Sequence, residues 1–245
     1  MGRVALITGA SGALGHAIAH GLAEEGFDLA LHYRSGEDEA RELARELSEQ
    51  RHVRAMPVQA DVAKQDEVER MVEAIEHELG PIDVVVNNAG LVRDRTLQKM
   101  SEEDWDVVLD TNLRGTFHVC KSVVPRMRAR RQGRIINISS IVGAMGNYGQ
   151  VNYAASKAGL IGLTKSLAKE VARDQVTVNA ICPGFMDSPM VRGVPEPVQE
   201  KLVAQIPLGR FGEPSAVGDA VAYLAGRGGA WVTGQVLHVN GGMYM

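Results

Sequence analysis

The stretch that decides the fold is residues 3–15, RVALITGASGALG. It opens with a run of apolar and β-branched residues, which predicts a buried strand over Arg3–Thr8. Three glycines follow, the last of them at the start of a helical pattern over Leu14–Glu25. Glycines between a strand and a helix allow a tight turn and let backbone N–H groups approach a pyrophosphate. A plain flexible turn is the alternative, and the rest of the chain has to decide.

Beyond this turn the chain keeps alternating short apolar runs with longer helical patterns. Further strands are predicted at Leu29–His32, Val53–Val58, Ile82–Val86, Arg134–Ile138, Val176–Ile181 and Gln235–Val239. Helices are predicted at Glu37–Glu49, Val68–Leu79, 151–173 and Ser215–Ala225, and as one long helix after Ser101 whose apolar face includes Phe117 and Met127. This alternation predicts one doubly wound α/β Rossmann domain over residues 1–245, with a parallel sheet covered on both faces. Residues 183–214 hold six of the nine prolines and are predicted to form a substrate lobe or lid at the carboxyl edge of the sheet.

Composition and charge exclude several classes of function. The 245 residues include 26 basic and 30 acidic side chains, a net charge of −4, whereas a general nucleic-acid binder is usually basic. No apolar run approaches the ~20 residues that a membrane-spanning helix needs. The two cysteines, Cys120 and Cys182, are too few for a disulfide framework and fit a reducing compartment. We therefore expect a cytoplasmic protein with no nucleic-acid or membrane partner.

The end of the second predicted strand bears on which dinucleotide the turn would bind. An acidic residue near this point binds the ribose 2′-hydroxyl of NAD, whereas an arginine suits the 2′-phosphate of NADP. Here Arg34 and Ser35 follow the strand, and no acidic residue comes before Glu37. The pattern favours NADP, with a solvated loop arginine as the alternative.

Other polar residues stand where predicted elements end. Asp61-Val62 follows the third strand and Asn87-Asn88-Ala89-Gly90 follows the fourth, although Asp and Asn are also common turn formers. Asn112 lies on the otherwise apolar face of the long helix, where a buried amide needs hydrogen-bond partners. We expect it to be either a structural hydrogen-bonding residue or part of a water relay.

Ser140, Tyr153 and Lys157 form the strongest chemical pattern. Tyr153 and Lys157 are four residues apart on a predicted helix, so their side chains share one face. A nearby ammonium stabilises a phenolate and lowers the tyrosine pKa toward the working range of a general acid. Ser140 follows a strand, where its hydroxyl can donate to a carbonyl that becomes an alkoxide. Taken alone, the tyrosine–lysine pair could equally be incidental on an exposed helix.

Three further patterns point elsewhere. His16 and His20 have the spacing of metal ligands on a helix but no third ligand, so no metal is expected. Asn137-Ile138-Ser139 is a formal glycosylation sequon inside a predicted buried strand. The basic run from Arg126 to Arg134 is either a solvated helix end or a docking patch for an acidic partner.

In their order along the chain, these motifs resemble those of the short-chain dehydrogenase/reductase family. The resemblance rests on Thr8-Gly9 to Gly15, Asp61, Asn87 to Gly90, Asn112, Ser140, Tyr153-x-x-x-Lys157 and Pro183-Gly184. Two segments, Arg134–Glu170 and Thr233–Met245, resemble the bacterial 3-oxoacyl-(acyl carrier protein) reductase branch. The resemblance runs from Arg3 to the C-terminus and implies a sheet of about seven strands.

The resemblance also implies roles for individual residues. It makes Tyr153 the general acid, Ser140 the group that holds the substrate carbonyl, and Asn112 a support for a proton relay. Lys157 would bind the nicotinamide ribose and lower the pKa of Tyr153. Asp61 would contact the adenine, and Asn88 with Gly90 would line the adenosine. The full set of implied cofactor contacts is Gly9, Ser11, Gly12, Leu14, Arg34, Ser35, Asp61, Val62, Asn88, Ala89, Gly90, Tyr153, Lys157, Pro183 and Gly184.

The implied activity is NADPH-dependent reduction of a 3-oxoacyl thioester, borne by acyl carrier protein, in fatty acid synthesis. The implied assembly is a homotetramer packed through the helices at 105–127 and 151–171. One departure bears on the cofactor: where the family's turn usually has Arg and then Gly, this chain has Gly12 and Ala13, which leaves Arg34 as the main candidate for the 2′-phosphate and NAD(H) as the alternative cofactor. The alternative functions are reduction of another ketone, such as acetoacetyl-CoA, a sugar or a quinone, and a catalytically silent nucleotide-binding scaffold.

Overall fold

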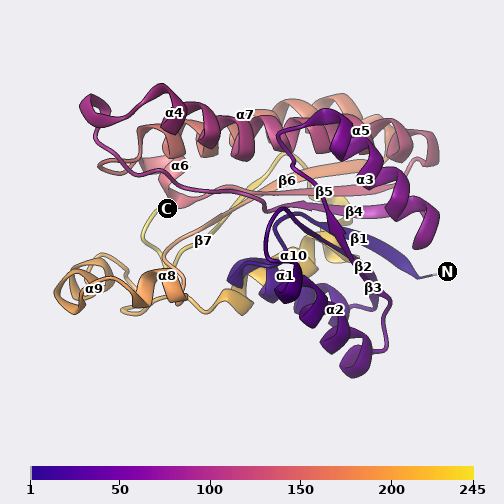
Figure 1. The fold of residues 1–245 in the computed structure, drawn as a ribbon, viewed down its shortest axis with the longest axis horizontal. Helices are drawn as coiled ribbons and strands as arrows, with labels where there is room; N and C mark the ends of the chain where they lie inside the picture. Colours follow the sequence, from indigo (N-terminus) through magenta and orange to yellow (C-terminus); the bar gives the residue numbers. More distant parts are fainter. Residues whose placement is uncertain (1) are drawn as a thin grey trace.

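A computed structural model describes residues 2–245 and contains a parallel sheet in the order β3-β2-β1-β4-β5-β6-β7 (Figure 1). The strands are β1 (Arg3–Ile7), β2 (Phe27–Tyr33), β3 (Ala55–Gln59), β4 (Ile82–Asn87), β5 (Gly133–Ile138), β6 (Val176–Pro183) and β7 (Val236–Val239). The predicted doubly wound α/β fold is confirmed. The strand order reverses between β1 and β4, and folds of this kind bind ligands at that point, outside the carboxyl ends of the strands.

Helices cover both faces of the sheet (Figure 1). One face carries α1 (Ala13–Glu24), α2 (Glu37–Arg51) and α10 (Pro214–Ala225), and the other carries α3 (Gln65–Glu78), α5 (Gly115–Arg130) and α7 (Val151–Val171). The inner strands are almost wholly buried, with every residue of β2 and β6 inaccessible or nearly so, whereas the edge strands β3 and β7 are partly exposed. Two aliphatic clusters, one on each face, therefore form the core and hold the carboxyl edge in place.

The segment predicted as a lobe extends beyond the carboxyl edge of the sheet. It contains two short helices, α8 (Pro189–Arg192) and α9 (Glu196–Val203), which lie to one side of the main body in Figure 1. Its role as a substrate lobe or lid stays a prediction. The other short elements are α4 (Glu102–Leu109), α6 (Ile141–Met145), η1 (Leu97–Lys99), η3 (Ala172–Asp174) and η4 (Gly228–Trp231).

The long helix predicted after Ser101 is interrupted. A capping box between Ser101 and Asp104 starts α4, but a π-helical turn, η2 (Asp110–Arg114), then separates α4 from α5. A π-turn adds a residue to the helical register, so one 3.6-residue pattern cannot describe both halves. Phe117, which was assigned to the buried face, is accordingly 48% exposed. Asn112 lies within this turn, and π-turns are frequent at functional sites.

Candidate active site

The glycine-rich turn leads into an open helix N-terminus. Gly9 adopts a φ of +65°, and a Cβ there would lie 2.9 Å from Ala89 Cα, so the turn requires glycine. Gly15 is equally confined, because a Cβ would clash with the carbonyl of Gly9. Helix α1 has no side-chain cap and no acidic residue in its first turn, whereas α2 and α3 both begin with acidic side chains. This uncapped helix end fits the pyrophosphate of a dinucleotide.

Asn88 and Thr8 fasten the turn to the end of β4. Asn88 Nδ2 donates to the carbonyls of Thr8 and Gly9, each at 3.0 Å. Thr8 Oγ1 accepts from the backbone N–H groups of Asn88 and Ala89 at 2.9 and 3.0 Å. Both side-chain donors of Asn88 are thus used within the protein, and only its Oδ1 could contact a ligand. Its place along the adenosine stays a prediction.

The loop after β3 carries the residues expected near the adenine. Asp61 Oδ1 accepts from Ala63 N at 3.0 Å, and Asp61 N donates to Glu67 Oε2 at 2.7 Å. Val62 is buried, and its carbonyl accepts from His118 Nδ1 at 3.0 Å. The carboxylate of Asp61 is therefore held by its own loop through one oxygen, which leaves the second for a ligand.

Arg34 and Ser35 lie on an exposed loop beside the glycine-rich turn. Ser11 Oγ donates to the Ser35 carbonyl at 3.4 Å, and Gln59 Nε2 donates to the Arg34 carbonyl at 3.2 Å. These contacts hold the main chain of the loop next to Ser11 and leave the Arg34 side chain exposed. The structure therefore brings the main chain of Arg34 and Ser35 close to Ser11, and their role at a 2′-phosphate stays a prediction.

Ser140, Tyr153 and Lys157 meet at the carboxyl end of β5. Ser140 caps helix α6, and its Oγ accepts from Val142 N at 3.1 Å. Ser140 is also the neighbour whose hydroxyl opposes the rise in the pKa of the Tyr153 phenol. Lys157 Nζ lies 5.6 Å from the centroid of the Tyr153 ring. Because Ser140 Oγ accepts from the backbone, its own proton remains available for donation to a ligand oxygen.

Burial dominates the electrostatics of this cluster. The Lys157 side chain is buried, its Nζ donates to the Ile138 carbonyl at 2.8 Å, and burial lowers its pKa to about 8. Burial raises the pKa of Tyr153, and the neighbouring Ser140 hydroxyl opposes the rise. The expected lowering of the tyrosine pKa by Lys157 is absent, because desolvation pushes both groups toward their neutral forms. A neutral phenol is the form that can donate a proton.

Asn112 was expected to be either a structural hydrogen-bonding residue or part of a water relay, and its contacts are those of a structural residue. Its Oδ1 accepts from Leu91 N at 2.9 Å, and its Nδ2 donates to the Leu91 carbonyl at 3.0 Å and to Ser156 Oγ at 3.1 Å. Ser156 Oγ donates in turn to the Tyr153 carbonyl at 2.8 Å. Asn112 thus connects the π-turn, the loop after β4 and the helix that carries Tyr153. Its role in a proton relay stays a prediction.

The remaining expected cofactor contacts border the same edge. A Cβ on Gly90 would lie 3.2 Å from Asn112 Oδ1 and 3.5 Å from Lys157 Nζ, so glycine keeps the loop close to the lysine. Pro183 ends β6, and Gly184 N donates to the Val239 carbonyl at 2.9 Å. Leu14 is half-buried against the core, whereas Gly12 is exposed at the turn.

Two polar residues that the sequence analysis did not assign to the site hold the helix that carries Tyr153 and Lys157. Asn152 Nδ2 donates to the carbonyls of Arg93 and Asp104 at 3.1 and 2.9 Å, and its Oδ1 accepts from Tyr153 N at 2.8 Å. Ser139 Oγ donates to the Lys157 carbonyl at 2.7 Å. The only signal in the sequence is their position directly before Tyr153 and Ser140.

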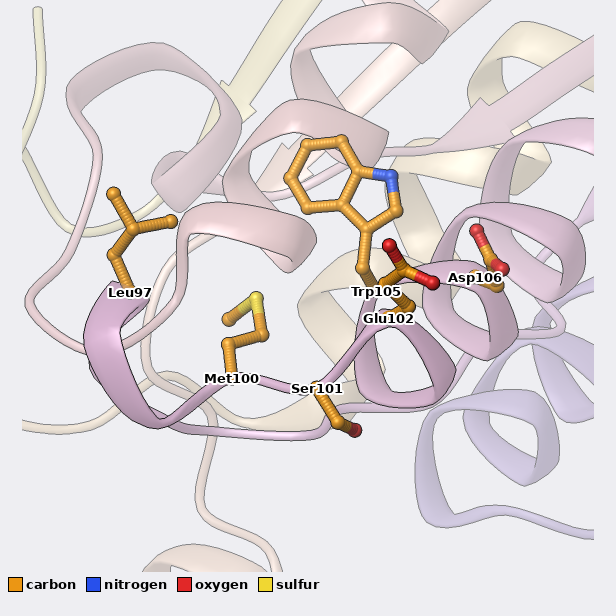
Figure 2. A pocket seen from close by; sticks show the side chains of 6 residues that line it. All are labelled: Leu97, Met100, Ser101, Glu102, Trp105 and Asp106. Atoms are coloured by element: carbon orange, nitrogen blue, oxygen red, sulfur yellow. The ribbon is translucent and has the colours of Figure 1, made fainter.

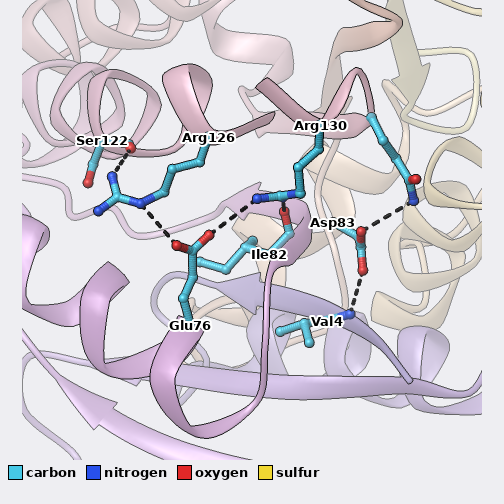
Figure 3. Close-up of polar contacts among 8 residues, drawn as sticks. Val4, Glu76, Ile82, Asp83, Ser122, Arg126 and Arg130 are labelled. Atoms are coloured by element: carbon cyan, nitrogen blue, oxygen red, sulfur yellow. Dashed lines mark hydrogen bonds and ion pairs between the residues drawn. The ribbon is translucent and has the colours of Figure 1, made fainter. Parts of the chain in front are cut away.

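The basic run lies at the opposite edge of the sheet. Arg126 and Arg130 both contact Glu76, at 3.0 and 3.5 Å, and Arg130 Nη2 donates to the carbonyl of Ile82, the first residue of β4 (Figure 3). Arg128 Nε lies 2.6 Å from Asp174 Oδ2. Arg126 and Arg130 are therefore internal ion-pair partners at the amino ends of the strands. Arg131 also approaches Asp174, at 3.9 Å, and its Nη2 donates to the Arg173 carbonyl at 2.9 Å. Arg128 and Arg131 are nevertheless exposed and are the two arginines of helix α5 and its end that a docking partner could reach.

The other sequence patterns take no part in the site. His20 Nε2 lies 3.6 Å from Glu46, and residues 2–245 contain no group of three or more side chains placed to hold a metal. Asn137 is fully buried and bonds to Asn87 and Thr164, so the sequon lies in the core.

None of the helices in residues 2–245 is long and apolar enough to cross a bilayer. A surface pocket beside α4 contains no expected site residue; it is lined by Leu97, Met100, Ser101, Glu102, Trp105 and Asp106 (Figure 2).

Comparison with known proteins defines the class. Residues 9–244 match a family model described as enoyl-(acyl carrier protein) reductase. The chain belongs to the short-chain dehydrogenase/reductase family. It is thus an oxidoreductase that acts on CH–OH or C=O groups, and the family implies a nicotinamide dinucleotide cofactor.

Three of its similar relatives share the name 3-oxoacyl-(acyl carrier protein) reductase. The chain is 47% identical to a 3-oxoacyl-(acyl carrier protein) reductase of Staphylococcus epidermidis over 245 residues, which is the whole of both chains. It is 46% identical to the enzyme of the same name from Staphylococcus aureus over 245 residues, all of this chain and 99% of the relative. The counterpart from Vibrio cholerae is 45% identical over 244 residues, covering 100% of this chain and 98% of the relative.

Proposed function

We propose that this protein reduces a 3-oxoacyl thioester, borne by acyl carrier protein, to the 3-hydroxyacyl thioester in fatty acid synthesis, with NADPH as reductant. The observation that carries the proposal is the convergence of Ser140, Tyr153 and Lys157 at the carboxyl edge, next to Gly90 on the loop after β4. The substrate class is supported by relatives that are 44–47% identical over essentially their whole length and are named for this reaction.

The protein's own residues bind the keto oxygen and supply the proton. Ser140 donates a hydrogen bond to that oxygen, because its Oγ already accepts from Val142 N. The Tyr153 phenol, which burial keeps neutral, donates its proton to the same oxygen as negative charge develops there. Lys157 donates to the Ile138 carbonyl and would also hold the nicotinamide ribose. When bound, the reduced nicotinamide supplies the hydride to the keto carbon.

Different residues along the carboxyl edge would bind different parts of the dinucleotide. The open N-terminus of α1, with Gly9, Ser11 and Gly12, would hold the pyrophosphate. Asp61 and Val62 would take the adenine, and Arg34 with Ser35 the 2′-phosphate. We choose NADP because an exposed arginine occupies the end of β2, where NAD sites use an acidic residue.

We further propose a cytoplasmic homotetramer packed through α4, α5 and α7. Phe117 and Val151 are 48% and 42% exposed, so α5 and α7 present apolar side chains outward. The basic run lies at the amino edge, away from Tyr153. A carrier protein on Arg128 and Arg131 of one subunit would therefore serve the site of a neighbouring subunit.

A substrate panel tests the proposed function. Acetoacetyl groups on acyl carrier protein and on coenzyme A, a free keto sugar and a quinone are each offered with NADPH, and kcat/KM is measured. The carrier-bound substrate is expected to give the highest kcat/KM. A preference for the sugar or the quinone would make the protein a reductase of another ketone, and no oxidation of NADPH with any of them would support the silent scaffold.

A further inference from the structure

His32 is a buried imidazole between two parts of the cofactor edge. It is 1% exposed and lies near the end of β2. Its Nδ1 is 3.0 Å from the backbone nitrogen of Gly9, in the glycine-rich turn. Its Nε2 is 3.0 Å from the carbonyl oxygen of Ala60, directly before Asp61. One side chain therefore joins the turn to the loop that carries Asp61.

These two contacts fix the protonation state of the ring. A backbone N–H can only donate and a carbonyl can only accept, so Nδ1 must be bare and Nε2 must carry the proton. Burial lowers the pKa of His32 to about 4, although the hydrogen bond to the Ala60 carbonyl and the nearby charge of Asp61 both act to raise it. The ring is thus neutral at physiological pH and presents one acceptor and one donor in fixed directions.

The bond to Gly9 holds an unusual backbone conformation. Gly9 has a φ of +65°, its carbonyl accepts from Asn88 Nδ2 at 3.0 Å, and its N–H is taken by His32. The next residue is tied to the same strand, because Ala10 N donates to the His32 carbonyl at 2.8 Å. The Gly9 amide is therefore not itself a phosphate donor, and its orientation sets where the open N-terminus of α1 lies.

We propose that His32 is a positioning residue for the dinucleotide: it holds the glycine-rich turn for the pyrophosphate through Gly9 and couples that turn to the Asp61 loop through Ala60. The proposal rests on the proposed function only in taking this turn as the pyrophosphate site. Loss of the Gly9 bond leaves a buried N–H without an acceptor and frees the turn. The cost falls on cofactor affinity, while Ser140, at the start of α6, and Tyr153, on α7, lie beyond β4 and keep their geometry.

Two substitutions separate the two bonds. In His32→Asn the side-chain oxygen can take the place of Nδ1 and accept from Gly9, but the side chain is too short for Ala60. In His32→Gln the amide can reach Ala60 and donate, but it leaves Gly9 unpaired. Each variant loses one buried hydrogen bond, so the pair is matched for stability. His32→Leu loses both.

The test is direct titration of NADPH, followed by the fluorescence of the reduced nicotinamide, with thermal melting of each variant as control. We expect His32→Asn to bind NADPH within about threefold of the wild type and His32→Gln to bind roughly tenfold more weakly, the usual effect of one unpaired buried donor. His32→Leu should be at least as weak as His32→Gln. At saturating NADPH, kcat should be unchanged within about threefold in all three.

Equal affinities for the Asn and Gln variants, or wild-type affinity in His32→Gln, would overturn the proposal. If the variants fail to fold, ¹⁵N NMR of wild-type His32 decides: a proton on Nε2 from pH 6 to 8, with and without NADPH, is expected, and a proton on Nδ1 in either state contradicts the proposal. Binding is measured without any ketone, so these results stand even if 3-oxoacyl thioesters prove not to be substrates.

Discussion

The two ends of the cofactor edge are built in different ways. The chemical end is the part of the edge around Ser140 and Lys157, and both side chains are buried. Ser140 Oγ accepts from the backbone N–H of Val142, and Lys157 Nζ donates to the carbonyl of Ile138 on β5. At the adenosine end, Arg34 is exposed, and the contacts of its loop with Ser11 and Gln59 use main-chain carbonyls.

This difference predicts a division of labour. Groups that are buried and hydrogen-bonded cannot move without breaking other contacts, so the chemistry depends on all of them at once. An exposed side chain on a loop can be exchanged with little effect on its surroundings. Substitutions at the chemical end should therefore change kcat, and substitutions at the adenosine end should change the preference between NADPH and NADH.

The largest effect is expected from Tyr153→Phe. The change keeps the ring and removes the proton donor, and general acid catalysis is worth ~10²–10⁴-fold. kcat should fall by at least that factor, with the Kd for NADPH within about threefold of wild type. Turnover like that of the wild type would exclude Tyr153 as the acid.

Lys157→Met should weaken NADPH binding and lower kcat, because the ammonium is proposed to hold the nicotinamide ribose and with it the position of the nicotinamide. Although the substitution should impair function, it should raise the thermal stability of the protein. Burial lowers the pKa of Lys157 to about 8, below its ordinary value of 10.5, so folding disfavours the charged form below pH 8 and this penalty fades as pH rises toward 10.5. The variant should therefore melt higher than wild type at pH 7, with a gain that shrinks by pH 10. A lower melting temperature at pH 7 would contradict this account of the lysine.

Arg34→Asp tests the adenosine end. A charge-assisted contact is worth about 1.5–3 kcal/mol, so KM for NADPH should rise at least about tenfold, while NADH is unchanged or improved. Equal weakening of both cofactors would make Arg34 only a surface residue.

Gly12→Arg should act in the opposite direction and tighten NADPH selectively. A Cβ at Gly12 meets no clash, because the nearest atom of a non-neighbouring residue is the Gly9 carbonyl oxygen at 3.7 Å, and Gly12 is exposed. The ratio of the Kd values for NADPH and NADH measures the effect. An unchanged ratio would show that the 2′-phosphate lies away from the turn.

The smallest effect is expected at the amino edge. Arg128→Glu with Arg131→Glu should slow turnover of the carrier-bound substrate a few-fold, by roughly 1 kcal/mol, and hardly affect the coenzyme A thioester. Added salt should reduce the difference. The control is Arg45→Glu with Arg70→Glu, two exposed residues on other helices. Equal losses on both substrates would mean that the patch is structural.

Much of this arrangement is visible in the sequence. Strand–helix alternation predicts the parallel sheet, and because parallel strands share a carboxyl edge, residues that follow strands, such as Asp61, Asn88 and Ser140, must lie along one edge. The i, i+4 spacing places Tyr153 and Lys157 together. These features depend on local periodicity and chain order, which the sequence contains.

The remainder depends on contacts between distant segments. No glycine or proline marks the π-turn at 110–114, so periodicity alone predicts a continuous helix. His32 and the side-chain nitrogen of Asn152 bond to backbone groups 23 or more residues away, and such partners leave no pattern in the sequence. The surroundings of the basic run could not be predicted for a similar reason. The run itself is obvious in the sequence, but its pairing with Glu76 and its place at the amino edge follow from the fold.

The division between the two ends is tested most directly by measuring kcat and the NADPH Kd for Tyr153→Phe and Arg34→Asp in parallel, with carrier-bound acetoacetate as substrate. The account predicts that Tyr153→Phe lowers kcat by at least ~10²-fold and leaves Kd near the wild-type value, whereas Arg34→Asp raises Kd at least about tenfold and leaves kcat at saturation near the wild-type value. If either substitution changed both quantities by comparable factors, the two ends would be one coupled unit and the account would be wrong.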